Sequence, residues 1–492
     1  MTNCDISNWL FITTCLNYAV LILLGHLRDF FHELFYGSVH KTPRGHAPLL
    51  SSFEDLYTRR IFRRVCDCWN RPIASRPGAY IEVMERISHN YNATLELTGR
   101  TLKCLNLASY NYLGFAESPP HVEAQVLSSL DQFGVSQGSP YGDCGGYTRV
   151  HQELEHMIAR FVGHEDAIIF SMGFATNSTT IPLLASSPEC LIISDQLNHM
   201  SIVNGVRSSS RACLVVFKHN DMEHLERIVR KSILEGQPKS HKPWKKIIII
   251  MEGIYSMEGE IANLKRAVEI KKKYGCYLYV DEAHSIGALG KTGRGACEYC
   301  GVNPQDVDIL MGTFTKSFGS VGGYVAASKE IISYLRKNCY GLTYGSSIPT
   351  PCAQQALSAL KVITGEDGTD LGRRKLQQLN ETSNYFREGL KKLGFEVISD
   401  VDSPVIITML YNPSKCAALS RMCLEEGIAV VVVGAPATET LNSRVRFCVS
   451  AAHTKEDIDF ALEKLDRLGD WTASKYKLFK SQTINDLYNI VF

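Results

Sequence analysis

Short continuous apolar runs, separated by amphipathic stretches, dominate the middle of the chain from about residue 167 onward. The runs read AIIF, CLII, ACLVVF, KIIIIM, CYLYV and VDILM. Strands that are apolar on both faces are typical of a parallel sheet with helices on each side. Between two of these runs, residues 221–234 place four apolar side chains on one helical face, behind Asp221 as an N-cap. The pattern predicts β-α-β units and an α/β fold with a doubly wound, mostly parallel sheet.

The pattern changes after about residue 349, where helices become longer and strands fewer. The expected strands are FEVIS, PVIITML and VRFCVS, and a last helix is announced by Thr454 with Asp457 three residues later, a start that resembles a capping box. This part predicts a smaller C-terminal α+β domain packed against the large one.

The N-terminus carries an apolar run, Trp9 to Gly25, slightly shorter than the roughly 20 residues of a typical bilayer crossing. It lacks a basic segment before it, so a cleaved signal peptide is the weaker interpretation. Arg28, Lys41 and Arg44 follow it, and this positive flank predicts that the main body faces the cytosol. We expect an N-terminal membrane anchor helix. An interfacial or hairpin anchor and a buried soluble helix are the alternatives.

Five segments are therefore expected. They are 1–50 as membrane anchor and juxtamembrane segment, 51–108 as connecting segment, 109–349 as large domain, 350–475 as small domain and 476–492 as tail.

Composition is that of a globular protein, with 492 residues, 45% of them hydrophobic and 21% charged. Because 52 basic residues balance 51 acidic ones, nothing in the charge indicates a nucleic-acid partner. The 16 cysteines are scattered, many of them in apolar runs, which favours a reducing compartment. The close pairs, Cys66 with Cys68 and Cys297 with Cys300, lack the second pair that a zinc site needs, so no metal site is expected.

Candidate chemistry lies at the ends of two apolar strands. Asp281 closes the run CYLYV, where an open α/β sheet binds ligands. A carboxylate there can keep a pyridine nitrogen protonated, and His284 can reach a ring hydroxyl of the same cofactor. Taken alone, either residue is equally consistent with a capped turn. Lys316 follows the next run, within GTFTKSFGSVGGY, and a lysine there can form an imine with an aldehyde cofactor.

Three stretches, EGIYSMEGE, YLYVDEAHSIGALGKTGRG and GTFTKSFGSVGGY, resemble the α-oxoamine synthase family of pyridoxal-phosphate (PLP) enzymes, which are related to class II aminotransferases. The resemblance runs from about Phe53 to Lys475, and the 35-residue spacing from Asp281 to Lys316 makes it specific. It implies the PLP-dependent transferase fold of type I, which is aspartate-aminotransferase-like.

The resemblance also implies roles for particular residues. Lys316 matches the lysine that binds PLP as a Schiff base, Asp281 the partner of the pyridine nitrogen and His284 the contact to the ring hydroxyl. His199, in SDQLNHMS, matches the histidine that stacks on the cofactor ring and touches the substrate carboxylate. Ser256, in EGIYSMEGE, is expected among the cofactor-binding residues.

A phosphate site is implied by the same comparison. Gly173 and Phe174, in SMGFATN, resemble the family's phosphate-binding turn, and a helix N-terminus suits that anion. Thr313 is expected to add a hydroxyl. Ser346 and Ser347, in YGSSIP, resemble the segment that reaches the phosphate of the opposite subunit.

Arg446, in SRVRFCVS, matches the family arginine that binds the amino-acid carboxylate, a task suited to its planar fork. We expect Arg444, two residues earlier, to face the other side of the strand. One segment departs from the family: Gly142 stands nine positions ahead of His151, where an arginine is usual. Residues 135–147 are therefore expected to alter a wall of the site.

The reaction implied is the decarboxylating condensation of L-serine with a long-chain acyl-CoA, normally palmitoyl-CoA, to 3-oxosphinganine. The implied partners are a related subunit that lacks the lysine, in a heterodimer, and small activating subunits. The implied location is the endoplasmic reticulum membrane, with the catalytic domain in the cytosol. Three alternatives are open: another α-oxoamine synthase, a non-catalytic regulatory subunit, which Lys316 argues against, and a plain aminotransferase.

Overall fold

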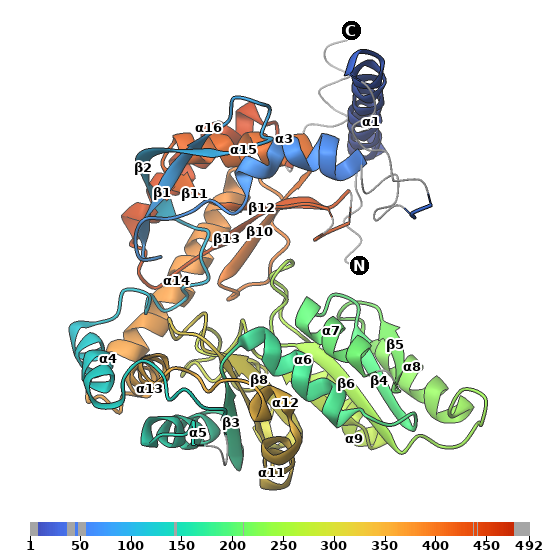
Figure 1. Ribbon diagram of the computed structural model, residues 1–492, viewed down its shortest axis with the longest axis vertical. Coiled ribbons are helices and arrows are strands. Elements are labelled where there is room, and N and C mark those ends of the chain that lie inside the picture. Colours follow the sequence, from blue (N-terminus) through green and yellow to red (C-terminus); the bar gives the residue numbers. More distant parts are fainter. Residues whose placement is uncertain are drawn as a thin grey trace.

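The computed structural model describes residues 8–36, 45–47, 56–141, 145–209, 211–435, 437–439 and 441–476. Two bodies of secondary structure are joined by a long helix, α14 (Leu371–Lys392). The lower body in Figure 1 contains a seven-stranded sheet, and the upper body contains two three-stranded sheets. The N-terminal helix α1 lies at the far end of the upper body.

The seven-stranded sheet is mostly parallel. Its order is β3-β9-β8-β7-β6-β4-β5, and only β9 runs antiparallel to its neighbours. In that order the strands are Asp166–Phe170, Gly323–Ala327, Ile309–Thr313, Tyr277–Asp281, Lys246–Glu252, Cys190–Asp195 and Cys213–Phe217. The six apolar runs of the sequence therefore form six of these strands, as predicted.

Helices surround this sheet and pack on its two faces (Figure 1). Helix α8 begins where the sequence predicts, because the side chain of Asp221 accepts a hydrogen bond from the backbone N–H of His224 (2.8 Å). The helices of this body are α4 (Pro120–Phe133), α5 (Arg149–Val162), α6 (Gly173–Leu184), α7 (Met200–Ser208), α8 (Met222–Glu235), α9 (Leu264–Tyr274), α10 (Ala296–Tyr299), α11 (Lys329–Asn338), α12 (Tyr340–Thr343) and α13 (Thr350–Thr364).

The upper body is α+β. One of its sheets has the order β10-β13-β12 and the other β1-β2-β11. Helix α16 begins with the predicted capping box, in which Thr454 and Asp457 each bond the backbone of the other. The C-terminal elements of the upper body are β10 (Val405–Tyr411), α15 (Pro413–Glu425), β11 (Ile428–Ala429), β12 (Val431–Val433), β13 (Ser443–Cys448) and α16 (Lys455–Trp471).

Two expectations about this body are wrong. FEVIS is not a strand, since only Val397 within it bridges another residue, Thr408. Residues 51–108 are not simply a connecting segment, because they contain strands β1 (Tyr80–Ile87) and β2 (Glu96–Asn106). Strand β2 pairs with β1 and also with β11, so this stretch is part of the upper body.

Helix α1 spans Asn8–Tyr36 and extends well beyond the apolar run seen in the sequence. Among the described residues it is the one helix long and apolar enough to cross a membrane, with a mean hydropathy of 1.8 over Leu10–Phe35. Asp29 of α1 bonds Arg59 (3.1 Å) and the Nε of Arg60 (2.6 Å) in the π-helical turn η1 (Tyr57–Phe62). These ion pairs fasten the apolar helix to the rest of the chain.

Candidate active site

Two buried carboxylates meet where neighbouring parallel strands end. Asp281 closes β7, and Glu252 closes β6 at the paired position in the register. Asp281 accepts hydrogen bonds at both oxygens, from the Nδ2 of Asn177 (2.7 Å) and from the backbone N–H of Ala283 (2.9 Å). Asp281 is therefore held as a fixed acceptor at the carboxyl end of the sheet.

Glu252 is a site residue that the sequence reading missed. Its Oε1 accepts a hydrogen bond from the backbone N–H of His199 (2.5 Å). Burial and the neighbouring Asp281 raise the pKa of Glu252 well above its ordinary value. The signal was present, because Glu252 closes the run KIIIIM just as Asp281 closes CYLYV.

We expect the raised pKa to make an amide a good substitute at this position. E252Q should retain kcat/KM within about threefold, because its side chain still accepts the bond from His199. E252A should lose roughly tenfold, since it leaves a backbone donor without its partner. Steady-state kinetics of the two purified variants check this, and equal losses in both would contradict it.

Lys316 lies beyond β8, with its Nζ 5.5 Å from the centre of the Tyr110 ring. Burial lowers the pKa of Lys316 to about 8, although Asp281 and Glu252 act in the opposite direction. Since an ordinary lysine titrates at about 10.4, the amine of Lys316 is more often neutral, and so more nucleophilic, near neutral pH.

This difference can be measured on the full chain without cofactor. Lys316 should react with an acylating reagent at pH 7.5 faster than the exposed Lys245, and its rate should rise as pH increases through about 8. Mass spectrometry of the labelled peptides follows both residues in one sample. A rate for Lys316 that keeps rising steeply to pH 10 would contradict the lowered pKa.

Arg446 lies over the same aromatic ring, with its guanidinium carbon 4.4 Å from the ring centre of Tyr110. The side chain is 7% exposed, its Nη1 donates to the Sδ of Met257 (3.6 Å), and its Nε lacks a partner among the described residues. Within the described chain no carboxylate pairs with it. Arg446 is thus a buried cation with free donors, suited to an external anion.

Arg444 does not face the other side of the strand, and that prediction is wrong. Its Nη1 donates to the carbonyl of Met257 (2.6 Å), the residue that also contacts Arg446, and it pairs with Glu258 (3.1 Å). Positions two apart in a strand share a face, which explains the common contact.

Two histidines flank this cluster. His284 is buried, its Nδ1 lies 2.7 Å from the hydroxyl of Tyr112, and its ring meets Tyr110 edge-on at 4.7 Å. Burial lowers the pKa of His284 well below its ordinary value, so the ring is neutral. His199 is exposed at the N-terminus of α7, where its Nδ1 lies 2.8 Å from the hydroxyl of Ser201.

The predicted phosphate turn lies at the start of α6. A Cβ at Gly173 would come within 2.9 Å of the Oγ1 of Thr313, so glycine permits this close approach of helix and strand end. Phe174 is partly exposed beside His199, at 6.2 Å between ring centres. A helix N-terminus next to a buried hydroxyl is a favourable place for a phosphate.

The remaining predicted residues are placed as follows. Ser256 is buried. Ser347 is buried against Ser139 of the same chain, and its backbone N–H donates to the carbonyl of Ser139 (3.4 Å). Gly142 lies outside the described residues.

Tyr141 and Tyr147, which border Gly142, both donate to the buried carboxylate of Glu155, which also pairs with Arg336 (3.1 Å). Tyr141 and Tyr147 of the unusual segment are therefore held by one buried carboxylate.

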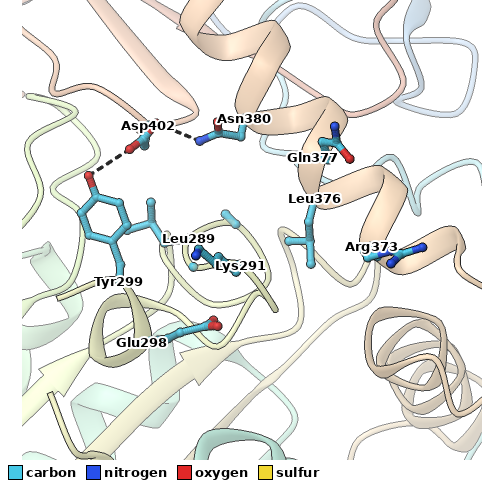
Figure 2. A pocket seen from close by; sticks show the side chains of 11 residues that line it. Leu289, Lys291, Glu298, Tyr299, Arg373, Leu376, Gln377, Asn380 and Asp402 are labelled. Carbon is cyan, nitrogen blue, oxygen red and sulfur yellow. Dashed lines mark hydrogen bonds between the residues drawn. The ribbon is translucent and has the colours of Figure 1, made fainter. Parts of the chain in front are cut away.

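A separate cleft of about 740 Å³ lies between residues 288–299 and helix α14. Figure 2 shows Asp402 bonded by the hydroxyl of Tyr299 (3.1 Å) and by the Nδ2 of Asn380 (2.9 Å), while Arg373 points away from the hollow. None of the predicted site residues lines this cleft. The carboxylates of Asp402 and Glu298 in its lining accept hydrogen bonds from within the chain.

Comparison with known proteins agrees with this geometry. The model of the family "Aminotransferase class I and II" matches residues 103–465. Serine palmitoyltransferase 2 of Dictyostelium discoideum is 53% identical over 461 residues, 93% of each chain. Long chain base biosynthesis protein 2a of Arabidopsis thaliana is 52% identical over 465 residues, 94% of each chain.

Solved structures show the same fold. Serine palmitoyltransferase of Sphingomonas wittichii superposes with a TM-score of 0.75 at 29% identity, over 87% of this chain and 99% of that one. A high-resolution structure of SPT with PLP internal aldimine gives 0.74 at 28% identity, over 87% and 100%. The predicted fold class is confirmed. The chain belongs to the class I and II aminotransferase family, among whose members it is similar over nearly its whole length to serine palmitoyltransferase 2 and the long chain base biosynthesis proteins 2.

Proposed function

We propose that the chain is the catalytic subunit of a serine C-palmitoyltransferase, which condenses L-serine with palmitoyl-CoA to 3-oxosphinganine in the first step of sphingolipid synthesis. The observation that carries the proposal is that Lys316 and Arg446 share one aromatic ring, that of Tyr110. An amine with a lowered pKa thereby lies close to a buried guanidinium that has no carboxylate of its own. The names of the relatives supply the substrate class.

The residues of the site fit PLP. The fixed carboxylate of Asp281 suits the pyridine nitrogen, and the neutral His284 suits the ring hydroxyl. The N-terminus of α6, with Thr313, suits the phosphate, and Lys316 suits the aldehyde. When bound, PLP supplies an electron sink for negative charge at the α-carbon of the amino acid.

Arg446 binds the serine carboxylate with two parallel N–H donors, and His199 bounds the substrate on the opposite wall. Lys316, once neutral, removes the α-proton of serine. The α-carbon then forms a bond to the thioester carbonyl carbon of palmitoyl-CoA, and the CoA thiolate leaves. The serine carboxylate leaves as carbon dioxide, and Lys316 returns a proton to the α-carbon. Holding the reacting groups in one geometry provides a large part of the rate.

Partners and location extend the proposal. A lysine-lacking related subunit forms the heterodimer, and small activating subunits join it. Helix α1 anchors the complex in the endoplasmic reticulum membrane, with the catalytic body in the cytosol. The length and apolar composition of α1, and its ion pairs to η1, support an anchor that is continuous with the folded chain.

The test uses the full chain purified with its partner subunit in detergent. CoA release and 3-oxosphinganine formation should both require L-serine, palmitoyl-CoA and PLP. Borohydride reduction of the holoenzyme should fix the cofactor on Lys316, as read by peptide mass spectrometry. A chain that carries PLP on Lys316 but condenses only another amino acid would indicate a different α-oxoamine synthase. Formation of pyridoxamine phosphate without use of acyl-CoA would indicate an aminotransferase.

A further inference from the structure

A buried histidine with a carboxylate at each ring nitrogen lies behind the site. His219 follows β5 and is 8% exposed. Its Nδ1 lies 2.9 Å from the Oδ1 of Asp195, and its Nε2 lies 2.7 Å from the Oε2 of Glu260. A neutral imidazole carries a single N–H, so donation to both carboxylates requires the doubly protonated ring. His219 is therefore an imidazolium.

One of its two partners belongs to the turn that carries His199. Asp195 is the last residue of β4, and its oxygens also accept from the backbone N–H groups of Leu197 (2.8 Å) and Asn220 (2.9 Å). The turn continues through Asn198, whose Nδ2 donates to the carbonyl of Ile250 (2.9 Å), into His199. The position of this turn decides where His199 lies.

The other partner belongs to the loop that supports Arg446. Glu260 accepts at its carbonyl a hydrogen bond from the backbone N–H of Tyr255 (3.0 Å), which closes the loop on itself. The same loop carries Met257, whose Sδ accepts from Arg446 and whose carbonyl accepts from Arg444. The loop thus supports Arg446, the other proposed contact to serine.

We propose that His219 is a positioning residue: its imidazolium bonds Asp195 and Glu260 together and so fixes the turn that ends at His199 relative to the loop that holds Met257 against Arg446. The inference rests on the proposed function in one respect, that His199 and Arg446 hold the serine. A single charged ring thus joins the turn that carries His199 to the loop that carries Met257. When the ring loses its charge, it loses one of its two N–H donors.

The charge persists at neutral pH. Burial disfavours the charged ring, yet the hydrogen bonds to Asp195 and Glu260 raise the pKa of His219 to about 9. The other ionisable groups around it are Tyr255, whose ring meets it edge-on at 4.3 Å, and Glu258, which is paired with Arg444 at 3.1 Å. The two hydrogen bonds of the charged ring to Asp195 and Glu260, here called the brace, are therefore lost as pH rises through about 9. Because the folded pKa lies above the ordinary value of about 6.5, the brace contributes its full stability below about pH 6.5 and loses it as pH rises through about 9.

The test compares H219Q with the wild-type holoenzyme in detergent. The dissociation constant of L-serine is read from the change in the visible spectrum of bound PLP between pH 7 and pH 10. We expect serine to bind H219Q about tenfold more weakly than wild type at pH 7.5. The ratio of the two constants should approach one near pH 10, because the wild-type ring has then lost its charge. For E260Q, the ratio of its serine dissociation constant to that of wild type should be largest at a pH between 7.5 and 10. One fewer carboxylate lowers the pKa of the His219 ring by about one unit or more, so the ring of E260Q loses its charge at a lower pH than the wild-type ring does.

E269Q is the matched control for E260Q. It makes the same Glu-to-Gln change on the exposed face of α9 and should bind serine as wild type does. Equal serine binding by H219Q and wild type at pH 7.5 would overturn the proposal. So would a tenfold ratio that stays constant to pH 10, because a loss of packing alone gives that result.

A second measurement separates this inference from the proposed function. Thermal unfolding of wild type and H219Q, followed from pH 6 to pH 10, should show a difference in Tm that is largest below about pH 6.5 and declines through about pH 9. If wild type fails to bind serine, the proposed function is wrong. The difference in Tm between wild type and H219Q then tests by itself whether the charged His219 ring joins Asp195 and Glu260. A difference in Tm that does not depend on pH would then overturn the proposal for His219.

Discussion

K316A is expected to lower kcat for condensation of serine with palmitoyl-CoA by at least about 10³-fold, since a general acid-base group alone contributes about 10²- to 10⁴-fold. The lysine has two proposed tasks, to hold the cofactor and to move the α-proton, and alanine removes both. The loss should appear chiefly in kcat. The carboxylate of serine would still meet Arg446, which lies over the ring of Tyr110 independently of Lys316. Single-turnover measurements of 3-oxosphinganine check the expectation.

K245A is the matched control, since the side chain of Lys245 is 77% exposed and the residue lies just before β6, at the opposite end of that strand from Glu252. A small primary amine added to K316A should restore part of the activity, because it supplies the missing base. K316A that keeps more than a tenth of the wild-type kcat would contradict the role. Retained PLP absorbance in the same sample would show that the pocket is intact.

The sheet was predictable because its inner strands, β4, β6, β7, β8 and β9, are buried on both faces. The runs KIIIIM and CYLYV contain no charged residue after Lys246, and each is followed at once by a site residue, Glu252 and Asp281 respectively. Strands β1 and β2 were missed for the opposite reason. In YIEVMERI buried and exposed residues alternate at first: Ile81 and Val83 are buried and Glu82 between them is exposed, as expected of an antiparallel strand with one face in water.

The site was predictable only in part. The chemistry of Asp281 and Lys316 follows from their place after strands, and Arg446 came from the resemblance alone, because 130 residues separate it from Lys316. The raised pKa of Glu252 depends on the register that sets it beside Asp281, which no local pattern reveals. Tyr110 was missed because aromatic residues in a loop carry no signal of the two cations that will flank them.

R446K is expected to raise KM for L-serine on the order of 30-fold, equivalent to about 2 kcal/mol for a charged hydrogen-bonded contact. Lysine keeps the charge but replaces a planar fork by a single point of donation, and its ammonium lies over Tyr110 less well than a guanidinium does. Because the Nε of Arg446 is free and the side chain is nearly buried, water cannot readily replace the lost donors. Unlike K316A, this variant should retain most of kcat once serine saturates the site.

The measurement is the dependence of initial rate on serine concentration, with palmitoyl-CoA in excess. R266K is the matched control, since Arg266 pairs with Glu226 (2.6 Å) on the surface of α9 and should leave KM unchanged. An amine without a carboxylate, such as ethanolamine, gives the decisive comparison. Wild type should bind it far more weakly than serine, and R446K should lose most of that preference, because the carboxylate is what the guanidinium recognises. If R446K still prefers serine as strongly as wild type does, another group holds the carboxylate, and the exposed ring of His199 would be the next to replace.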